Sequence, residues 1–413
     1  MRLKPIFIIE KCCLMPSTFK PPSIPQQVAT ITAFLLLLIS FAASPTAAYS
    51  CSGSSFSSEV VLNTGNMHFT EHHVITNCHF NGGLKVDYAG NNFYGQWTLS
   101  GGSAAFVKII NVNCDGCNFT VASTTVSPSS GYAIYFKSNV VTNRGWFIVR
   151  DSTITQSSSY HGIYVESTTF QRGSMLHYIG NSVLGTHSYA YIHPIEFWAA
   201  KLFDSELLFE RNLVLIQPPD DSFINCWRTT GGTIVNSKLL LFHNNFTGHG
   251  TGDKTLFYIA DSFSGSSQLT VTGNHMQASA ATNAVLFHFT QNFEAGTNIA
   301  IADNTFNTPG TAILFDKGSS AWAPTASTSF VIRCNLKNGA AWSPSLSPSQ
   351  TVVACATCSI VSDCVAENTI SVGGVAPSSC VCACRGTAAR FDAPRCETIP
   401  FTPSATLSVP ESS

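Results

Sequence analysis

The chain has 413 residues, of which 44% are hydrophobic and only 11% are charged. Charged residues make up about 25% of an average soluble domain, so Ser, Thr, Asn and Gly must supply most of the polar surface here. The 29 Phe residues exclude a disordered chain, and a formal net charge of −2 excludes electrostatically driven binding of nucleic acid.

The N-terminus carries an export signal. Residues 28–43, VATITAFLLLLISFAA, form an apolar run shorter than the about 20 residues that span a bilayer. Small residues follow it and predict cleavage near Ala48, so 1–48 is a signal peptide or, alternatively, an uncleaved signal anchor. Met15 is a second candidate start, because the stretch before the apolar run is long for a signal. We expect an extracellular or cell-surface protein that meets a membrane only through this segment.

Two apolar patterns then recur in step along the chain. The first runs into a turn-forming residue every 30 to 32 positions; its members are Asp151, Asn181, Asn212, Asn244, Asn274, Asn304 and Asn335, with weaker ones upstream at Asn77 and Asn113. The second pattern is an apolar run such as YAIYF at 132–136 or AVLFHF at 284–289. Two series with one period indicate a repeat array.

The repeating units are strands. Their runs are short, β-branched and aromatic, and Gly, Asn, Ser and Thr interrupt them, whereas helical repeats need longer runs of good helix formers. Propeller blades need about 40–45 residues, which exceeds this period. The pattern therefore predicts an all-β parallel β-helix of about nine coils, each with two clear strands and a short third.

The recurring asparagine has two structural explanations. Asn tolerates the left-handed backbone conformation of a sharp turn, and its amide can bond to equivalent amides in the coils above and below. The apolar residue two positions later should then point inward. We interpret the following residues as a structural ladder: Asn181, Asn212, Asn244, Asn274, Asn304 and Asn335.

The chain divides by pattern and composition. We assign 49–130 to irregular first coils and a cap, 131–340 to regular coils, 341–350 to a Pro/Ser linker, 351–398 to a Cys-rich module and 399–413 to a disordered tail.

The exported compartment favours disulfides over zinc, and no His lies between Cys334 and Cys396. The sequence leaves the connectivity of these eight cysteines open: Cys334, Cys355, Cys358, Cys364, Cys380, Cys382, Cys384 and Cys396. Five more lie upstream, of which Cys226 stands in an apolar stretch and is expected to be a buried, reduced thiol; the others are Cys51, Cys78, Cys114 and Cys117.

The coils resemble the pectin-lyase-like superfamily of right-handed parallel β-helices. The layout of signal, Asn-bearing coils and closing CATCSIVSDC…SSCVCACRG…RC pattern resembles the dispersed gene family and membrane-associated surface proteins of kinetoplastid protozoa, over residues 51 to about 398. This resemblance implies a right-handed helix closed by a disulfide-rich module, displayed at a cell surface.

The resemblance to this superfamily also suggests carbohydrate cleavage as a possible function. Asp220 and Asp221 precede a GHG motif centred on His249, in the order found in polygalacturonases. The upstream NTD motif is missing, and no Arg lies between Arg228 and Arg333 to bind an acidic sugar. We keep Asp220, Asp221 and His249 as a weak catalytic alternative, because solvated turn residues explain the two Asp equally well.

Two further pairs occupy the second strand series. Glu166 and Glu196 end strands in adjacent coils and could stack around calcium, but two carboxylates alone do not make such a site, so we expect no metal and no cofactor. Trp198 and Trp227 follow the same series and form either an aromatic platform for a sugar or protein, or simple packing against the coil.

Asn118 and Asn245 begin NFT sequons and are candidate glycosylation sites, Asn245 being placed outside by strand alternation. Together these patterns predict an exported, non-catalytic β-helix protein for adhesion or ligand binding. Its partner would be an unknown extracellular glycan or a host or prey surface protein. The rival hypotheses are a polysaccharide-active enzyme and a structural coat protein.

Overall fold

The computed structural model describes residues 49–156, 160–185, 193–216, 224–249, 254–279, 284–290, 293–308, 313–315 and 328–342, and strands at 351–353, 369–373, 381–384, 389–392 and 395–398. The expected signal (1–48), the linker from 343 onward and the tail (399–413) lie outside this set. Every regular element in the described ranges is a strand, and these ranges contain no helix that is long and apolar enough to cross a membrane.

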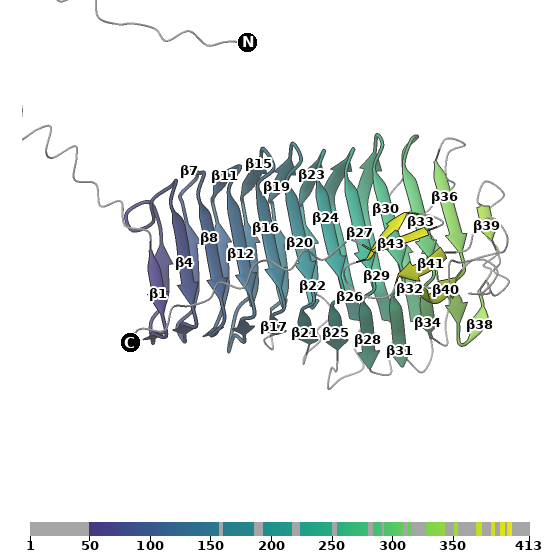
Figure 1. The fold of residues 1–413 in the computed structure, drawn as a ribbon, viewed down its shortest axis with the longest axis horizontal. Coiled ribbons are helices and arrows are strands. Elements are labelled where there is room, and N and C mark those ends of the chain that lie inside the picture. The colour runs from purple at the N-terminus through teal and green to yellow at the C-terminus, as the bar shows by residue number, and fades with distance from the viewer. Residues whose placement is uncertain are drawn as a thin grey trace, which may run out of the picture. The chain divides into compact units, whose positions relative to one another are not determined.

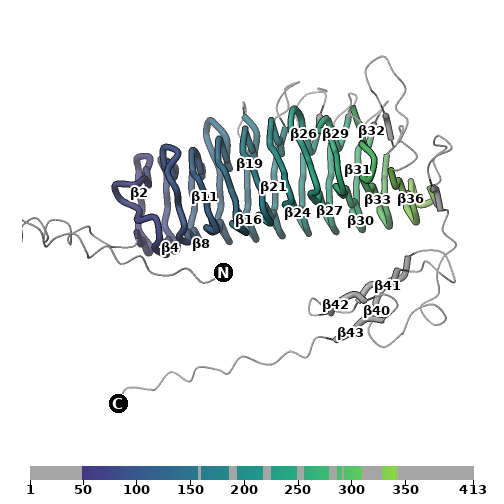
Figure 2. The backbone as a smooth tube through the Cα atoms, turned by 90° about the horizontal axis from the view of Figure 1, so that it is seen from above, coloured from purple at the N-terminus to yellow at the C-terminus, as the bar shows by residue number. Residues whose placement is uncertain are grey.

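The strands build a parallel β-solenoid in which equivalent strands of successive coils lie side by side (Figures 1 and 2). Sheet A contains, in stacking order, β1 (Ser50–Ser52), β4 (His72–Thr76), β8 (Gln96–Ser100), β12 (Asn118–Ala122), β16 (Trp146–Arg150), β20 (Met175–Ile179), β24 (Glu206–Glu210), β27 (Lys238–Phe242), β30 (Gln268–Thr272), β33 (Asn298–Ala302), β36 (Ser329–Arg333) and β39 (Thr351–Val353).

Sheet B follows sheet A within each coil. It contains β2 (Ser55–Phe56), β5 (His79–Phe80), β9 (Ser103–Ala104), β13 (Thr125–Val126), β17 (Thr153–Thr155), β21 (Ser182–Gly185), β25 (Leu213–Ile216), β28 (Asn245–His249), β31 (His275–Ser279), β34 (Thr305–Asn307), β37 (Leu336–Lys337) and β38 (Ala340–Ala341).

Sheet C closes each coil and bends into two columns of strands. The first column is β3 (Val60–Leu62), β6 (Leu84–Asp87), β10 (Val107–Ile110), β14 (Ile134–Lys137), β18 (Ile163–Glu166), β22 (Ile195–Trp198), β26 (Ile224–Val235), β29 (Lys254–Ser264), β32 (Ala284–Phe289) and β35 (Ile313–Phe315). The second is β7 (Asn92–Phe93), β11 (Asn113–Asp115), β15 (Val140–Thr142), β19 (Thr169–Gln171) and β23 (Lys201–Phe203), which the long β26 joins to the first.

The stack corrects the expected number of coils. Sheet A contains twelve strands among the described residues, where about nine coils were expected. The coils from β4 to β23 contribute four strands each, and those from β24 to β35 contribute three. The first coils are shorter than the later ones and unequal in length: paired residues lie 24 apart (His72 with Gln96), then 22 apart (Gln96 with Asn118) and then 28 apart (Asn118 with Trp146). The sequence undercounted the coils because the period of these first ones differs from the 30 to 32 residues of the later ones.

The asparagine ladder is a column of buried hydrogen bonds. Asn244 donates its backbone N–H and its Nδ2 to Oδ1 of Asn274, both at 2.9 Å, and Nδ2 also donates to the carbonyl of Phe209 at 2.8 Å. Asn181, Asn212, Asn274 and Asn304 repeat this geometry, and each is 1% exposed. Two positions later, Val183, Val214, Phe246, Met276 and Phe306 are fully buried.

The left-handed conformation belongs to the residue before each ladder position, which corrects the first explanation given for the asparagines. Arg211 (φ 53°) and His243 (φ 54°) make the turn, and Asn212 and Asn244 follow them. Asp151 (φ 51°) is likewise a turn residue. The ladder position beside it is Ser152, whose N–H donates to Asn181 Oδ1 at 3.0 Å. Asn77 is also a turn residue, and Asn113 lies in β11 of sheet C, away from the ladder.

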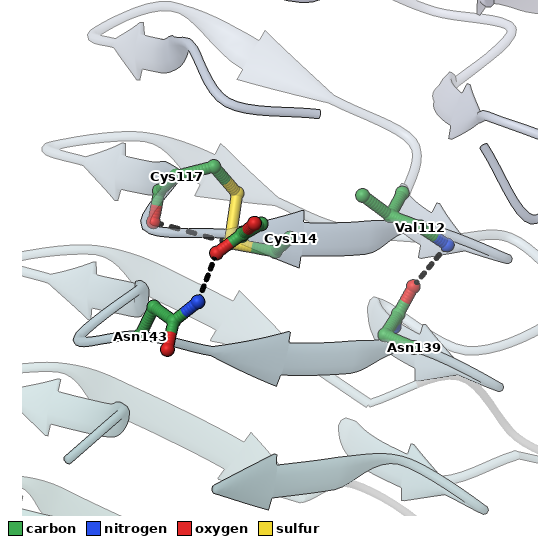
Figure 3. The surroundings of a disulfide bond; sticks show 6 residues. Val112, Cys114, Cys117, Asn139 and Asn143 are labelled. Atoms are coloured by element: carbon green, nitrogen blue, oxygen red, sulfur yellow. Dashed lines mark hydrogen bonds between the residues drawn. A yellow bond between two sulfur atoms is a disulfide. The ribbon is translucent and has the colours of Figure 1, made fainter. Parts of the chain in front are cut away.

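Shorter polar columns cap two further bends. At the bend of sheet C, Val112 donates its backbone N–H to Asn139 Oδ1 at 3.0 Å. At the bend into sheet A, Ser205 and Ser237 donate their backbone N–H groups to serine hydroxyls of the next coil. A disulfide between Cys114 and Cys117 spans this last bend (Figure 3). At these three bends, backbone N–H groups are thus satisfied by side chains of the coil beside them.

Cysteines outside the C-terminal module follow the coil geometry. Cys51 and Cys78 form a disulfide between neighbouring coils, and Cys226 is a buried thiol, as expected. Cys334 is disulfide-bonded. The pairing of the other module cysteines lies outside the described side chains, although β40 (Thr369–Gly373) pairs antiparallel with β41 (Val381–Cys384), and β42 (Ala389–Asp392) with β43 (Arg395–Thr398).

The ladder geometry predicts opposite effects of glycine at two adjacent positions. Arg211→Gly should leave the free energy of unfolding unchanged within about 1 kcal/mol, because glycine adopts positive φ without strain. Asn212→Gly should cost about 3 kcal/mol or more, because Asn181 and the carbonyl of Tyr178 lose buried partners. Urea denaturation of both variants measures this contrast; equal costs would mean that Asn212 serves only the turn.

Asp261 predicts a pH-dependent stability. Its Oδ1 accepts the Gly232 N–H at 2.8 Å, and burial raises the pKa of its carboxyl to about 7 from 3.8. A raised folded-state pKa gives stability that is complete below pH 4 and is lost as the pH rises through 7, at about 1.4 kcal/mol per pKa unit. Asp261→Asn should therefore match the wild type in melting temperature at pH 4 and exceed it at pH 8. A constant difference across this range would contradict the assignment.

Candidate functional site

The outer face of sheet C carries a cluster of aromatic and charged side chains in the middle of the stack. Strand register aligns Tyr135, Tyr164, Glu196, Arg228 and Tyr258 in one column across five coils. Alternation along each strand turns these residues outward, because their neighbours, such as Phe136, Val165 and Phe197, are buried in the core. We call this column, with Tyr132, His161 and His193 beside it, the outer-face cluster.

The first half of the cluster is a set of stacked rings. Tyr132 lies 4.6 Å from Tyr135 and 4.7 Å from Tyr164, measured between ring centroids. His161 stacks on Tyr164 at 4.8 Å and on His193 at 5.6 Å. Tyr164 and His161 are buried at the base, whereas Tyr132 and Tyr135 are half-buried and form an accessible rim.

The second half is an ion-pair network. His161 Nε2 lies 2.8 Å from Glu196 Oε2, and an Arg228 guanidinium nitrogen lies 3.6 Å from Glu196 Oε1. The Glu196 side chain is only 5% exposed, so removing it from water is compensated by these two partners. The Arg228 guanidinium also lies over the Tyr258 ring, 5.4 Å from its centroid.

The hydrogen bonds define the tautomer of His193. Arg228 can only donate, and its terminal nitrogen lies 3.1 Å from His193 Nε2, so Nε2 accepts and the ring proton of neutral His193 is on Nδ1. Burial, His161 and Arg228 together hold the pKa of His193 well below its ordinary value, which keeps the ring neutral. The backbone N–H of His193 donates to His161 Nδ1 at 2.9 Å. The Nε2 proton of His161 is therefore directed at Glu196.

Burial raises the pKa of Tyr132, Tyr135 and Tyr164, and the nearby Glu166 carboxylate adds to each effect. These phenols therefore keep their protons near neutral pH and can donate hydrogen bonds. One already does so, since the Tyr135 hydroxyl donates to Glu166.

The two glutamates proposed as a stacked pair do not stack. Register places Tyr164 opposite Glu196, and Glu166 opposite Trp198. Glu166 instead pairs with Lys137 at 3.1 Å. The described residues hold no group of three or more His, Cys, Asp or Glu side chains arranged to bind a metal ion.

The two tryptophans lie on opposite sides of the sheet, which excludes a shared platform. Trp227 is fully buried and stacks on Phe197 at 4.9 Å. Trp198 is 54% exposed and lies on the outer face, two residues after Glu196. Side chains alternate between the two faces of a strand, and residues 227 and 198 fall on opposite faces. Both tryptophans follow an apolar run in the sequence, so the sequence did not reveal this difference.

Other predicted site residues lie elsewhere. Asn245 is exposed on β28, and Asn118 is half-buried on β12 with Phe119 inward, so both sequons face outward. Asp220 and Asp221 fall outside the described residues, as does the side chain of His249, which ends β28.

Sequence reasoning missed His161, His193, Arg228 and the tyrosines. A signal was present in the second strand series, where the runs containing YAIYF, HGIYVE and HPIEFW place ring and charged residues at corresponding positions. Comparing these runs position by position, rather than as apolar runs, would have identified the column.

Comparisons with known proteins add little to this geometry. No family model matches the chain, and no curated protein matches it. Two trypsin-treated variants of QnrB1, a plasmid-mediated fluoroquinolone resistance protein, are similar at 13% and 16% identity over 55% of this chain. The alignments cover 82% and 84% of those chains, with TM-scores of 0.13 and 0.12.

Because Glu196 is buried, removing its carboxylate should lower the stability of the protein strongly. Glu196→Ala should lower the free energy of unfolding by about 3 kcal/mol, because Arg228 and His161 lose their common partner in a desolvated site. Glu210→Ala is the matched control, since Glu210 makes a surface pair with Arg211 at 3.6 Å and should cost less than about 1 kcal/mol. Chemical denaturation of both variants tests this, and similar costs would show that the network is solvated.

Proposed function

We propose that the protein binds a glycan on the outer face of sheet C, at the outer-face cluster. The observation that supports this most strongly is the combination of accessible rings with a buried polar network beneath them. Tyr160, 40% exposed, and Trp198, 54% exposed, lie with Tyr132 and Tyr135 around the buried Glu196 network. Sugars bind through ring faces that cover their C–H surfaces and through polar groups that meet their hydroxyls.

The state of the carboxylates favours binding over catalysis. Hydrolysis by a carboxylate pair needs one group as acid and another as base or nucleophile beside the bond that breaks. Glu196 uses both oxygens on His161 and Arg228, and Glu166 is held by Lys137 and by the Tyr135 hydroxyl. The network therefore orients hydrogen-bond donors and acceptors, and it leaves neither carboxylate available to act as an acid or a base.

The biological setting is part of the same proposal. Export through the N-terminal segment would place the solenoid outside the cell, as adhesion or ligand binding requires. We propose right-handed winding, which the general preference for right-handed parallel crossovers supports. We also propose a disulfide-rich closure, which the bonded state of Cys334 supports. We further propose kinship with the kinetoplastid surface proteins, which the layout of signal, coils and Cys-rich pattern supports.

Ring removal tests the binding site. A glycan array on the secreted protein identifies a ligand, and titration calorimetry measures its Kd. Tyr132→Ala and Trp198→Ala should each raise that Kd about tenfold, equivalent to about 1.4 kcal/mol. Tyr94→Ala is the control, because Tyr94 is 44% exposed in an early coil away from the cluster. Unchanged affinity in both cluster variants would move the site elsewhere.

The same protein preparation tests the alternative that the chain is a polysaccharide-active enzyme. The close His161–Glu196 pair is the reason to measure turnover. We expect no release of products when bound oligosaccharides are incubated with the protein. Turnover by the wild type that Glu196→Gln abolishes would overturn the binding-protein proposal.

A further inference from the structure

The outer face of sheet A carries large apolar side chains in the middle of the stack. Alternation along β16, β20, β24 and β27 turns them outward, because their sequence neighbours, such as Phe147, Tyr178 and Phe209, are buried in the core. We call the following half-buried side chains the sheet A patch: Trp146, Ile148, Ile179, Leu208, Leu240 and Phe242. A contiguous apolar patch on an outer face marks a contact with another molecule.

The same face is polar on both sides of this patch. Toward the N-terminal end of the stack, β8 turns Gln96 and Thr98 outward. Toward the C-terminal end, β30 turns Gln268 and Thr270 outward. An apolar centre within a polar rim is the arrangement found in protein–protein interfaces.

The face is also large enough for a stable dimer. The strands of sheet A from β1 to β36 number eleven, and they lie side by side with little twist (Figure 1). With about 4.8 Å between strands and about 3.3 Å per residue, eleven strands of about five residues cover about 800 Å². A standard interface buries about 800 Å² on each partner, so two such faces in full overlap reach that size.

The charges beside the patch favour one arrangement of two copies. Arg150 and Glu210 occupy equivalent positions on β16 and β24, on either side of β20. A two-fold axis along β20 reverses the coil order in the second copy, so it places Arg150 opposite Glu210 of that copy, and Ile148 opposite Leu208. Because β20 is the sixth of the eleven strands, this axis also gives full overlap. A two-fold axis along the stack would place Glu206 opposite Glu210, and these like charges repel.

We propose that two copies of the chain pair face to face through sheet A, with their coil orders reversed about β20. Glu206 stays compensated in this interface, because it pairs within its own copy with His177 at 3.0 Å and with Lys238 at 3.8 Å. The outer-face cluster lies on sheet C, so this pairing does not involve it and does not depend on glycan binding.

The first experiment measures the mass of the secreted protein by sedimentation equilibrium. We expect twice the mass of one chain for the wild type. Leu208→Arg should give the mass of one chain, because it brings an unpaired charge into the centre of the interface. Leu213→Arg is the matched control and should leave the dimer intact, since Leu213 is 40% exposed on β25 of sheet B in the same coil.

A monomeric wild type would overturn the proposal. If Leu208→Arg then made residues 343–413 more sensitive to protease, that segment of the same chain would be the occupant of the face. A dimer that survives Leu208→Arg would place the interface elsewhere and would equally overturn the proposal.

The second experiment exchanges two charges at the solvated edge of the patch, where Arg150 is 54% and Glu210 30% exposed. Arg150→Glu and Glu210→Arg each place like charges opposite one another twice in the dimer, and each should raise the dimer Kd about tenfold at low salt. The double variant restores opposite charges and should return the Kd to the wild-type value. A double variant that dimerises no better than the single variants would overturn the proposed arrangement.

Discussion

The structure depends on in-register stacking of coils through parallel hydrogen bonds. Each strand can pair only with the equivalent strand in the next coil, so equivalent residues must lie one above another. Once sheet A is in register, for example Lys238 against Gln268 and Gln268 against Asn298, the bends and the other sheets follow. The asparagine ladder and the inward columns of the core both result from this constraint.

The columns divide the structural tasks among the positions of a coil. The bend after sheet A needs one residue with positive φ and, next to it, a side chain that satisfies the backbone of two coils. Arg211 and Asn212 show that different residues fulfil these needs, since many residues tolerate the first position and Asn suits the second best. Inward columns of Phe, Val and Ile then form one continuous core.

Side chains that point outward do not take part in the turn, the ladder or the core. The outer-face cluster consists of such side chains. Five coils contribute one member each to the column from Tyr135 to Tyr258, so no local motif brings the members together. The network is buried at its base, with ring faces at its rim. Such a rigid, prearranged surface suits recognition, because the side chains need little ordering when a ligand binds.

The sequence by itself determined the period, the strands, the inward residues and the asparagine column, because the core repeats at every coil and so leaves a regular signal. It aligned the turn residue Asp151 with the ladder asparagines, although the ladder position in that coil is Ser152, because a turn residue and a ladder residue are adjacent and both polar. Only the tertiary structure decided that Trp227 is buried while Trp198 is exposed, and that Glu196 meets His161 and Arg228 rather than Glu166. These contacts depend on register between coils of unequal length, which fixes the relation of outward side chains without imposing any repeat on them.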